Sequence, residues 1–444
     1  MIASPAQFFA TTTAVCIALI LLTPLSVLGL AVLNTGLARA RSAAHTMIAA
    51  LAIFAVATIM YFVFGFAWQS VAGGPQHIFV LSGKPWGWIA AQPFFLRSIQ
   101  FDGSPTSLIA VLQIVSVGLA ALIPLGAGLE RWRLSASLLS TVLLAGWTYP
   151  LFAHWVWGGG WLAQLGTNYY LGSGFLDAGG SSTIQAVGGL TALSIAWILR
   201  PRKGKYSQGA LPAALPGHNV VFAILGCLLA LVGWIALNSA GAILFYGIDA
   251  GRIVLVVLNT ILTCSSSSLT TAAVTKFRLG KPDASLIANG WMGGLAASGA
   301  ACAFIPPALA MIIGIVAGTI VPLSVELFEA KLAVDDPGGA ISSHGIAGLW
   351  GILAAGLFAR MSLVAGGSGE AGGSGQLLAQ VIGIATLIGL VLPLTYSLNW
   401  LLNRLYPQRL ASEGEWQGID LHELGGGAYP EFVTRGDDFT SPRD

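Results

Sequence analysis

The sequence predicts an all-α membrane protein with eleven transmembrane helices, built as a 5+5 inverted repeat plus one extra C-terminal helix. Three observations lead to this fold class. Of the 444 residues, 55% are hydrophobic and only 9% are charged, which is too few polar residues to cover a water-soluble surface. Apolar runs of about 20 residues, the length that crosses the hydrocarbon core, recur along the chain. Two short motifs, far apart in the sequence, resemble each other.

The apolar runs give the expected positions of the helices. They lie near residues 9–33, 43–68, 105–127, 134–157, 178–199, 218–240, 253–275, 284–302, 305–326, 340–360 and 376–402. The first run has no basic segment before it, so it is interpreted as a retained span rather than a cleaved signal peptide.

The distribution of Lys and Arg predicts the orientation, because these residues accumulate in cytoplasmic loops. With eleven spans, sixteen of the twenty basic residues fall on one side, and only Lys84, Arg97, Arg252 and Arg360 fall on the other. A missed or invented helix would move every later loop to the wrong side. We therefore expect eleven spans in the cell membrane, with the N-terminus outside and the C-terminus in the cytoplasm.

The chain divides into two expected parts. Residues 1–403 form the transmembrane domain, with pseudo-repeats at about 9–200 and 218–360 and a last helix at about 376–402, and residues 404–444 form a cytoplasmic tail. The net charge of +2 predicts no nucleic-acid partner. The four cysteines lie in apolar stretches without metal-ligand spacing, so neither a metal nor another cofactor is expected.

The two similar motifs locate a candidate site. The first runs from Asp177-Ala-Gly-Gly to Gln185, and the second runs from Asp336-Pro-Gly-Gly to His344. The first opens the fifth span from outside and the second opens the tenth span from the cytoplasm, so the copies run in opposite directions. Inverted repeats place transport sites near the membrane midplane. Eight helical residues place Gln185 and His344 roughly 12 Å from their Asp residues, which is near that midplane.

Each motif residue has an alternative interpretation. A polar side chain at the midplane indicates a solute pathway or a proton relay, but it also suits an interhelical hydrogen bond that only holds the bundle together. An Asp at a helix start caps free backbone N–H groups. We interpret Asp336 as such a cap, and we allow Asp177 a second role.

Further stretches carry a resemblance to a known family. They are Gly36-Leu-Ala-Arg39, Glu130-Arg-Trp-Arg-Leu-Ser135, His154-Trp-Val-Trp157, Pro216-Gly-His-Asn219, Gly233-Trp234 with Asn238, Asp335-Asp336-Pro and the tail from Gly418 to Tyr429. Together with the two motifs they resemble the ammonium transporter, methylammonium permease and Rhesus glycoprotein family over essentially the whole chain. The resemblance implies a homotrimer with one narrow pore per protomer, and a possible cytoplasmic regulator of the PII type.

Four residues keep the pattern of that family. By resemblance, Trp157 forms the aromatic wall of an outer vestibule that recruits ammonium, where it offers a cation–π surface. Asp177 is the buried carboxylate below the vestibule. Trp234 lines the pore, and His344 is one of two pore histidines.

Four other positions depart from the pattern. Gln185 replaces the second pore histidine, Ser116 and Leu237 stand where two Phe rings usually form a gate, and Gly241 replaces a vestibule Ser. A carboxamide does not titrate, so a Gln–His pair should relay protons poorly. The loss of two aromatic rings should make the outer constriction wider or wetter.

The leading hypothesis is transport of ammonium or ammonia, with recruitment at Trp157 and Asp177 and passage between Gln185 and His344. One alternative is a channel of the same fold for another small polar or neutral solute, such as a methylated amine or a dissolved gas. A second alternative is a ligand sensor that does not conduct. An enzyme is not expected, because His154 and His218 have no partner at the spacing of a catalytic triad or metal site.

Overall fold

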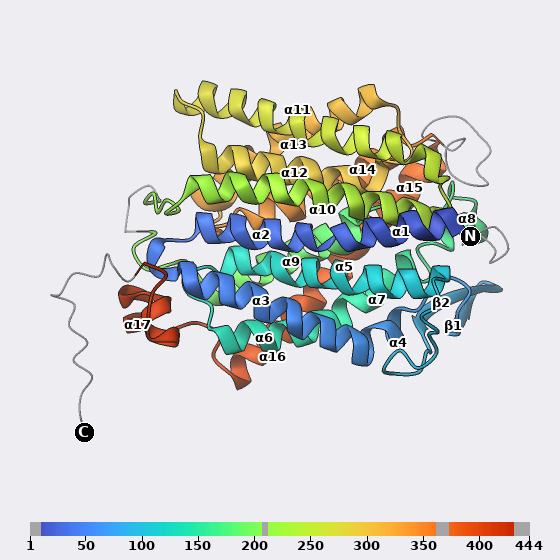
Figure 1. The fold of residues 1–444 in the computed structure, drawn as a ribbon, viewed down its shortest axis with the longest axis horizontal. Coiled ribbons are helices and arrows are strands. Elements are labelled where there is room, and N and C mark those ends of the chain that lie inside the picture. The colour runs from blue at the N-terminus through green and yellow to red at the C-terminus, as the bar shows by residue number, and fades with distance from the viewer. Residues whose placement is uncertain (1–9, 207–211, 361–372, 430–444) are drawn as a thin grey trace.

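The computed structural model describes residues 10–206, 212–360 and 373–429, and the statements below concern these residues. Long helices run in a common direction (Figure 1). The start of α1 (Ala10–Leu22) and the short tail helix α17 (Ser412–Gln417) lie at opposite ends of the bundle. This arrangement agrees with an odd number of crossings.

Ten helical stretches of the described chain are long and apolar enough to cross a membrane, and each coincides with a predicted span. They comprise α1 with α2 (Pro24–Leu37), α3 (Ala43–Met60) with α4 (Phe66–Gln69), α5 (Pro105–Gly128), α6 (Leu134–Leu143) with α7 (Tyr149–Val156), α9 (Val187–Leu199), α10 (Val220–Tyr246), α11 (Ile253–Leu279), α13 (Pro307–Glu326), α14 (Ala347–Phe358), and α15 (Ser374–Thr386) with α16 (Leu392–Leu405).

The remaining predicted span, 284–302, forms the helix α12 (Ala284–Ala301). It is not among the ten apolar stretches, because it carries Asn289 and several glycines. It packs against α11, α13 and α14, and most of its residues are buried. Its small residues permit this close packing: a Cβ on Gly294 would lie 2.6 Å from the backbone of Cys264. Surrounded by other helices, α12 does not need an apolar surface.

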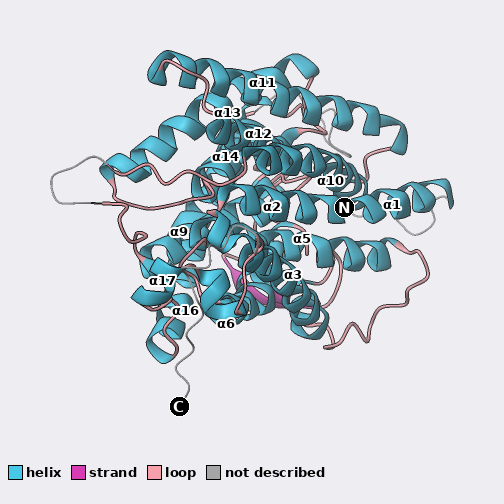
Figure 2. Ribbon diagram, turned by 60° about the vertical axis from the view of Figure 1, so that its left-hand side comes forward, coloured by secondary structure: helices cyan, strands magenta, loops and turns pink. Residues whose placement is uncertain are grey.

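A β-hairpin is the one sheet among the described residues, and the all-helical prediction missed it. Strands β1 (Gln76–Leu81) and β2 (Lys84–Ala90) pair in antiparallel register, and they are drawn in magenta in Figure 2. The hairpin lies at the end of the bundle where α1 begins, near the short helix α8 (Leu165–Tyr169) (Figure 1).

The two motifs found in the sequence each open with a π-helical turn of six residues. The first turn, η5 (Ser181–Ala186), leads into α9, and the second, η8 (Ile341–Ile346), leads into α14. The two segments cross at glycines. A Cβ on Gly189 would lie 2.2 Å from the backbone N of Gly345, and a Cβ on Gly348 would lie 2.6 Å from the carbonyl O of Ser181. Gly189 and Gly348 are the twelfth residues after Asp177 and Asp336, and this reciprocity is what an inverted repeat predicts.

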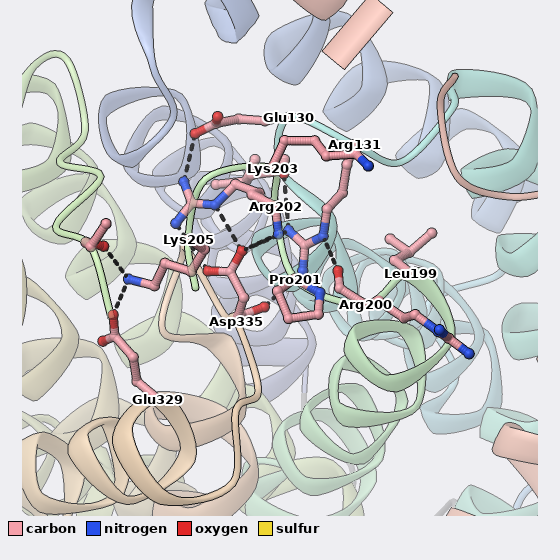
Figure 3. A network of polar contacts seen from close by, with 12 residues as sticks. Glu130, Arg131, Leu199, Arg200, Pro201, Arg202, Lys203, Lys205, Glu329 and Asp335 are labelled. Carbon is pink, nitrogen blue, oxygen red and sulfur yellow. Dashed lines mark hydrogen bonds and ion pairs between the residues drawn. The ribbon is translucent and has the colours of Figure 1, made fainter. Parts of the chain in front are cut away.

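A buried ion-pair network joins distant parts of the chain at the end of the bundle that holds α17 (Figure 3). The guanidinium of Arg202 donates to both carboxylate oxygens of Asp335, at 2.9 and 3.0 Å, and to Glu130 at 2.7 Å. Arg39 also pairs with Glu130. Arg131 lies 3.8 Å from the Asp335 carboxylate and donates to the Asp335 carbonyl at 2.7 Å. The segments that follow α2, α5 and α9 are thereby tied to the segment that precedes η8.

The charges of this network compensate one another. Burial alone would raise the pKa of Asp335, but Arg131 and Arg202 outweigh that effect and lower it from 3.8 to about 2. A carboxyl group with a lowered folded-state pKa stabilises the fold above its ordinary pKa. This stabilisation is lost as the pH falls from about 4 towards 2.

The described part of the tail folds back onto the same end of the bundle. Asp420 accepts hydrogen bonds from the N–H groups of Ala44 and His45 at the start of α3, at 3.1 and 2.7 Å. Glu423 accepts from Leu134 N at the start of α6 and from the His45 ring, both at 2.9 Å. Carboxylates are favourable at helix N-termini, so the tail caps two transmembrane helices.

We predict that Asp335→Asn destabilises the protein strongly, because it leaves the buried Arg131 and Arg202 without their shared anion. Breaking a buried ion pair in this way costs about 3–5 kcal/mol. Thermal unfolding of the purified protein in detergent measures the effect.

The matched control is Glu326→Gln. Glu326 pairs with Arg278 at 2.8 Å, but both side chains are about half exposed. An exposed pair contributes at most about 1 kcal/mol, so this variant should unfold close to wild type. Equal losses in the two variants would contradict the role assigned to the network.

Candidate functional site

The residues singled out in the sequence lie in two clusters along the bundle. One cluster contains Trp157 and Asp177, at the start of the first motif. The other contains Gln185, His344 and Trp234, where the two motifs cross. The side chains of both clusters are buried, with at most 6% of each residue exposed.

Asp177 caps the π-helical turn η5. Its Oδ1 accepts a hydrogen bond from the N–H of Gly180 at 2.8 Å. Its Oδ2 accepts from the N–H and the hydroxyl of Ser182, at 2.9 and 2.5 Å, and from the N–H and hydroxyl of Thr183, at 3.1 and 3.3 Å. Both carboxylate oxygens are therefore engaged by the protein. The cap predicted for an Asp at this position is present, and any action of Asp177 on a solute is through its charge rather than by direct contact.

Trp157 is fixed beside Asp177 by two contacts. Its indole N–H donates to the carbonyl O of Asp177 at 2.7 Å, and its ring stacks on Phe245, with centroids 4.4 Å apart and planes 10° from parallel. The hydroxyl of Tyr246 accepts from the N–H of Asp177 at 2.7 Å. The Phe245 ring thus covers one face of the Trp157 indole and fixes the orientation of the indole plane.

Phe245 belongs to a stripe on α10 that the sequence analysis recognised only in part. Trp234, Leu237, Gly241 and Phe245 follow one another at intervals of three, four and four residues, so they share one face of the helix. The stripe links the two clusters: Trp234 lies near His344, with ring centroids 6.4 Å apart, and Phe245 stacks on Trp157. The helical spacing from Gly241 was the signal that could have identified Phe245.

At Gly241 the backbone of α10 lies close to the backbone of Ala178. A Cβ at this position would lie 2.1 Å from the carbonyl O of Ala178. A serine therefore requires the segment after Asp177 to move, which gives a physical reason for the glycine.

Gln185 and His344 are brought together by the glycine crossing. The Gln185 Oε1 lies 2.7 Å from Nδ1 of His344, so the imidazole donates and the amide oxygen accepts. Both residues are 1% exposed. In this arrangement the proton of the neutral imidazole is on Nδ1, and Nε2 carries a lone pair.

This pair leaves two complementary polar atoms unused. The amide nitrogen of Gln185 is buried and donates no hydrogen bond to any described residue. The Nε2 of His344 likewise makes none within the described chain, where its only hydrogen bond is through Nδ1. One unused donor and one unused acceptor are thus present at the crossing of the two repeats. Buried polar groups normally have partners, so both atoms indicate a place for a small polar molecule.

The Ser116 and Leu237 side chains are also buried, and no hydrogen bond joins Ser116 to either cluster. The Ser116 hydroxyl donates to the carbonyl of Leu112 in its own helix at 2.9 Å. One turn earlier on α5, Gln113 accepts from the Tyr149 hydroxyl at 2.5 Å, and its amide nitrogen is a buried donor without a described partner. The sequence analysis missed Gln113, although a Gln in an apolar span is itself a signal.

The described residues contain no group of three or more His, Cys, Asp or Glu side chains that could hold a metal ion. Asp336 caps η8 through one oxygen, which accepts from Ile341 N at 2.7 Å. Its other carboxylate oxygen is buried and has no described partner.

The comparisons with known proteins agree on one family. The model of the Ammonium Transporter Family matches residues 12–429. The chain is 33% identical to the ammonium transporter Amt2 of Archaeoglobus fulgidus, over 91% of this chain and 85% of that one. It is 30% identical to the ammonium transporter of Bacillus subtilis, over 91% and 95%.

Among solved structures, a sensor Amt protein superposes with a TM-score of 0.82 at 24% identity, over 93% of this chain and 97% of that one. Mep2 of Candida albicans superposes with a TM-score of 0.79 at 24% identity, over 99% and 94%. These two similarities concern the fold. Together with the match to the family model, they establish that this multi-pass membrane protein belongs to the ammonium transporter family.

Proposed function

We propose that each protomer conducts ammonia derived from ammonium through a narrow pore between Gln185 and His344. The proposal is based on two atoms without a described hydrogen bond between these residues, the amide nitrogen of Gln185 and Nε2 of His344. Ammonia accepts one hydrogen bond through its lone pair and donates others, so it fits the Gln185 amide N–H on one side and the His344 Nε2 lone pair on the other. The ammonium ion has no lone pair and cannot accept from Gln185. The arrangement therefore favours the neutral molecule.

The outer cluster is proposed to recruit the cation. The Trp157 ring offers a π face, and Asp177 contributes negative charge from just beneath it. Because both oxygens of Asp177 are engaged, recruitment proceeds without a direct contact to that carboxylate. The cation gives its proton to water on the Trp157 side before it reaches the Gln185–His344 pair, where the Gln185 carboxamide neither takes up nor releases a proton near neutral pH.

The assembly and orientation are proposed on the family pattern. The pore-forming domain spans residues 1–403 and the tail spans residues 404–444, in a homotrimer within the cell membrane. The N-terminus lies outside and the tail lies in the cytoplasm, as the distribution of Lys and Arg indicates. A PII-type protein is a possible partner on the side of the tail.

A second candidate function is passage of a methylated amine. It is favoured by Ser116 and Leu237, whose side chains are smaller than the Phe rings of the family pattern. A wider constriction tolerates an additional methyl group.

We predict that Gln185→Leu lowers ammonium-driven flux at least about tenfold, because a buried donor that holds the solute is removed. Gln185→His should instead increase the charge-coupled part of the transport, because a second imidazole can pass a proton. Currents on a solid-supported membrane, compared with ammonia uptake by the same proteoliposomes, separate these two effects. Flux unaffected by Gln185→Leu in correctly folded protein would refute passage beside this residue.

We predict that the double change Ser116→Phe and Leu237→Phe lowers methylammonium flux more than ammonium flux. One methyl group in an apolar constriction changes discrimination by about tenfold or more. Competing uptake of the two amines into proteoliposomes measures the ratio. An unchanged ratio would remove the support for the second candidate function.

A further inference from the structure

Phe245 is the last side chain of the stripe on α10 that links the two clusters. The earlier members, Trp234, Leu237 and Gly241, are buried, and at most 2% of Trp234 or Leu237 is exposed. Phe245 itself is only partly buried. It is the penultimate residue of α10, which ends at Tyr246, at the end of the bundle where α1 begins (Figure 1). The face of α10 that leads to the central pair is therefore first exposed at the Phe245 ring.

Trp157 lies behind Phe245 and is almost enclosed. Only 6% of Trp157 is exposed, and its ring is stacked on Phe245 with the centroids 4.4 Å apart. Rings at this separation are in contact, so a cation cannot enter between them, because it needs its own contact distance to each ring. The ring of the stack that a cation from solution can approach is the more exposed one, which is Phe245.

The place of the Phe245 ring is set by its neighbours on α10. A Cβ on Gly241, one turn earlier, would lie 3.5 Å from Cδ2 of Phe245, so the ring packs beside a position that has no side chain. The next residue, Tyr246, accepts a hydrogen bond from the N–H of Asp177 at 2.7 Å. Two consecutive residues of α10 therefore contact the two members of the outer cluster, Trp157 and Asp177.

The chemistry of this stack favours a cation over a neutral amine. The face of an aromatic ring carries negative charge density, which attracts a cation positioned over it. Asp177 adds a buried carboxylate to the same cluster, but both of its oxygens already accept hydrogen bonds from the protein. A cation that arrives at this cluster therefore gains more from an aromatic face than from direct contact with the carboxylate.

We propose that Phe245 presents the first aromatic face that an ammonium ion contacts at the mouth of the pore. The ion binds over the face of Phe245 that is turned away from Trp157, and Trp157 supports the ring from behind. Phe245 is thus a residue that determines the preference for a cation at the mouth. The assignment rests on the proposed recruitment of ammonium by the outer cluster, and it is independent of the passage between Gln185 and His344.

The transport test changes the charge of the ring and keeps its shape. Phe245 is replaced site-specifically by phenylalanine that carries one, two or three ring fluorines, which withdraw electrons from the ring face. The apparent KM for ammonium is measured from currents of proteoliposomes on a solid-supported membrane. The KM should rise with each fluorine, to about fivefold for three, as expected for the loss of one cation–π contact, while the maximal current stays unchanged. A KM that does not follow the number of fluorines would show that Phe245 only packs against Trp157 and would overturn the proposal.

Two natural substitutions separate the ring face from the apolar volume. Phe245→Tyr keeps the ring and should keep the wild-type KM. Phe245→Leu keeps an apolar side chain without a π face and should raise the KM about as much as the ring with three fluorines. The same KM in Phe245→Leu and wild type would contradict a role for the aromatic face.

Phe222 provides the matched control for the fluorine series. It lies at the opposite end of α10, is 38% exposed, and has its ring beside that of His218, with centroids 6.4 Å apart. The same fluorinated residues at this position should leave the KM unchanged. A parallel rise at Phe222 would show a general effect of fluorination and would overturn the assignment to Phe245.

A binding test does not depend on transport. The unfolding temperature of the full-length protein in detergent is measured while sodium chloride is replaced by ammonium chloride at constant ionic strength. A ligand that binds the folded state raises this temperature, and the rise should become smaller as fluorines are added at Phe245 but not at Phe222. A rise that follows the fluorines at Phe245 in a protein without ammonium flux would leave the contact standing and refute the proposed function. Flux in a protein whose KM and unfolding temperature both ignore the fluorines would overturn the contact and leave the proposed function standing.

Discussion

The structure depends on a close crossing of two helices whose backbones touch at glycines. Gly189 and Gly348 occupy equivalent places in the two motifs, and a side chain on either would collide with the backbone of the other segment. Without a hydrophobic driving force between helices in lipid, such backbone approaches are what hold segments together. The crossing also sets the chemistry, because Gln185 lies four residues before Gly189, and His344 lies four residues before Gly348. The polar pair at the centre is thus a consequence of the packing of the repeats.

The second constraint is that polar groups inside the bundle need partners. The protein satisfies nearly all of them locally. Asp177 takes up the free N–H groups of η5, and the hydroxyls of Thr263 and Thr271 donate to carbonyls of α13 at 3.1 and 2.8 Å. Charges are collected outside the spans, where Asp335 and Arg202 form a bidentate pair. Buried atoms without a described partner nevertheless remain, and two of them, Nε2 of Gln185 and Oδ1 of Asp336, belong to the two motifs.

The sequence predicted what depends on composition and periodicity. Every predicted span forms a helix, because a run of about 20 apolar residues has few other stable structures in a membrane. The meeting of Gln185 and His344 followed from the repeat, since equal spacing from Asp177 and Asp336 places both at the same depth. The Asp caps were also predictable, because an Asp at a helix start commonly accepts hydrogen bonds from the free backbone N–H groups.

Other features were not accessible because they depend on tertiary contacts. The π-helical turns have no distinct periodicity, and the sequence analysis predicted no strands at β1 and β2. The spacing on α10 places Phe245 on the same face as Gly241, but its stacking on Trp157 is a tertiary contact that the spacing does not predict. The absence of a described partner for the Gln185 amide nitrogen is likewise invisible in a sequence, because it depends on all the residues around that atom.

The two motifs begin with Asp caps at equivalent positions, but the hydrogen bonds of the two caps differ. Both carboxylate oxygens of Asp177 accept hydrogen bonds, Oδ1 from the N–H of Gly180 and Oδ2 from Ser182 and Thr183. In Asp336, Oδ2 accepts from the N–H of Ile341 and Oδ1 has no described partner. The centre carries an amide that cannot titrate. In the proposed pathway, a proton at the centre therefore meets one imidazole, that of His344, rather than a pair of them. Equivalent positions in the two motifs thus carry side chains of different proton chemistry, Gln185 in the first and His344 in the second.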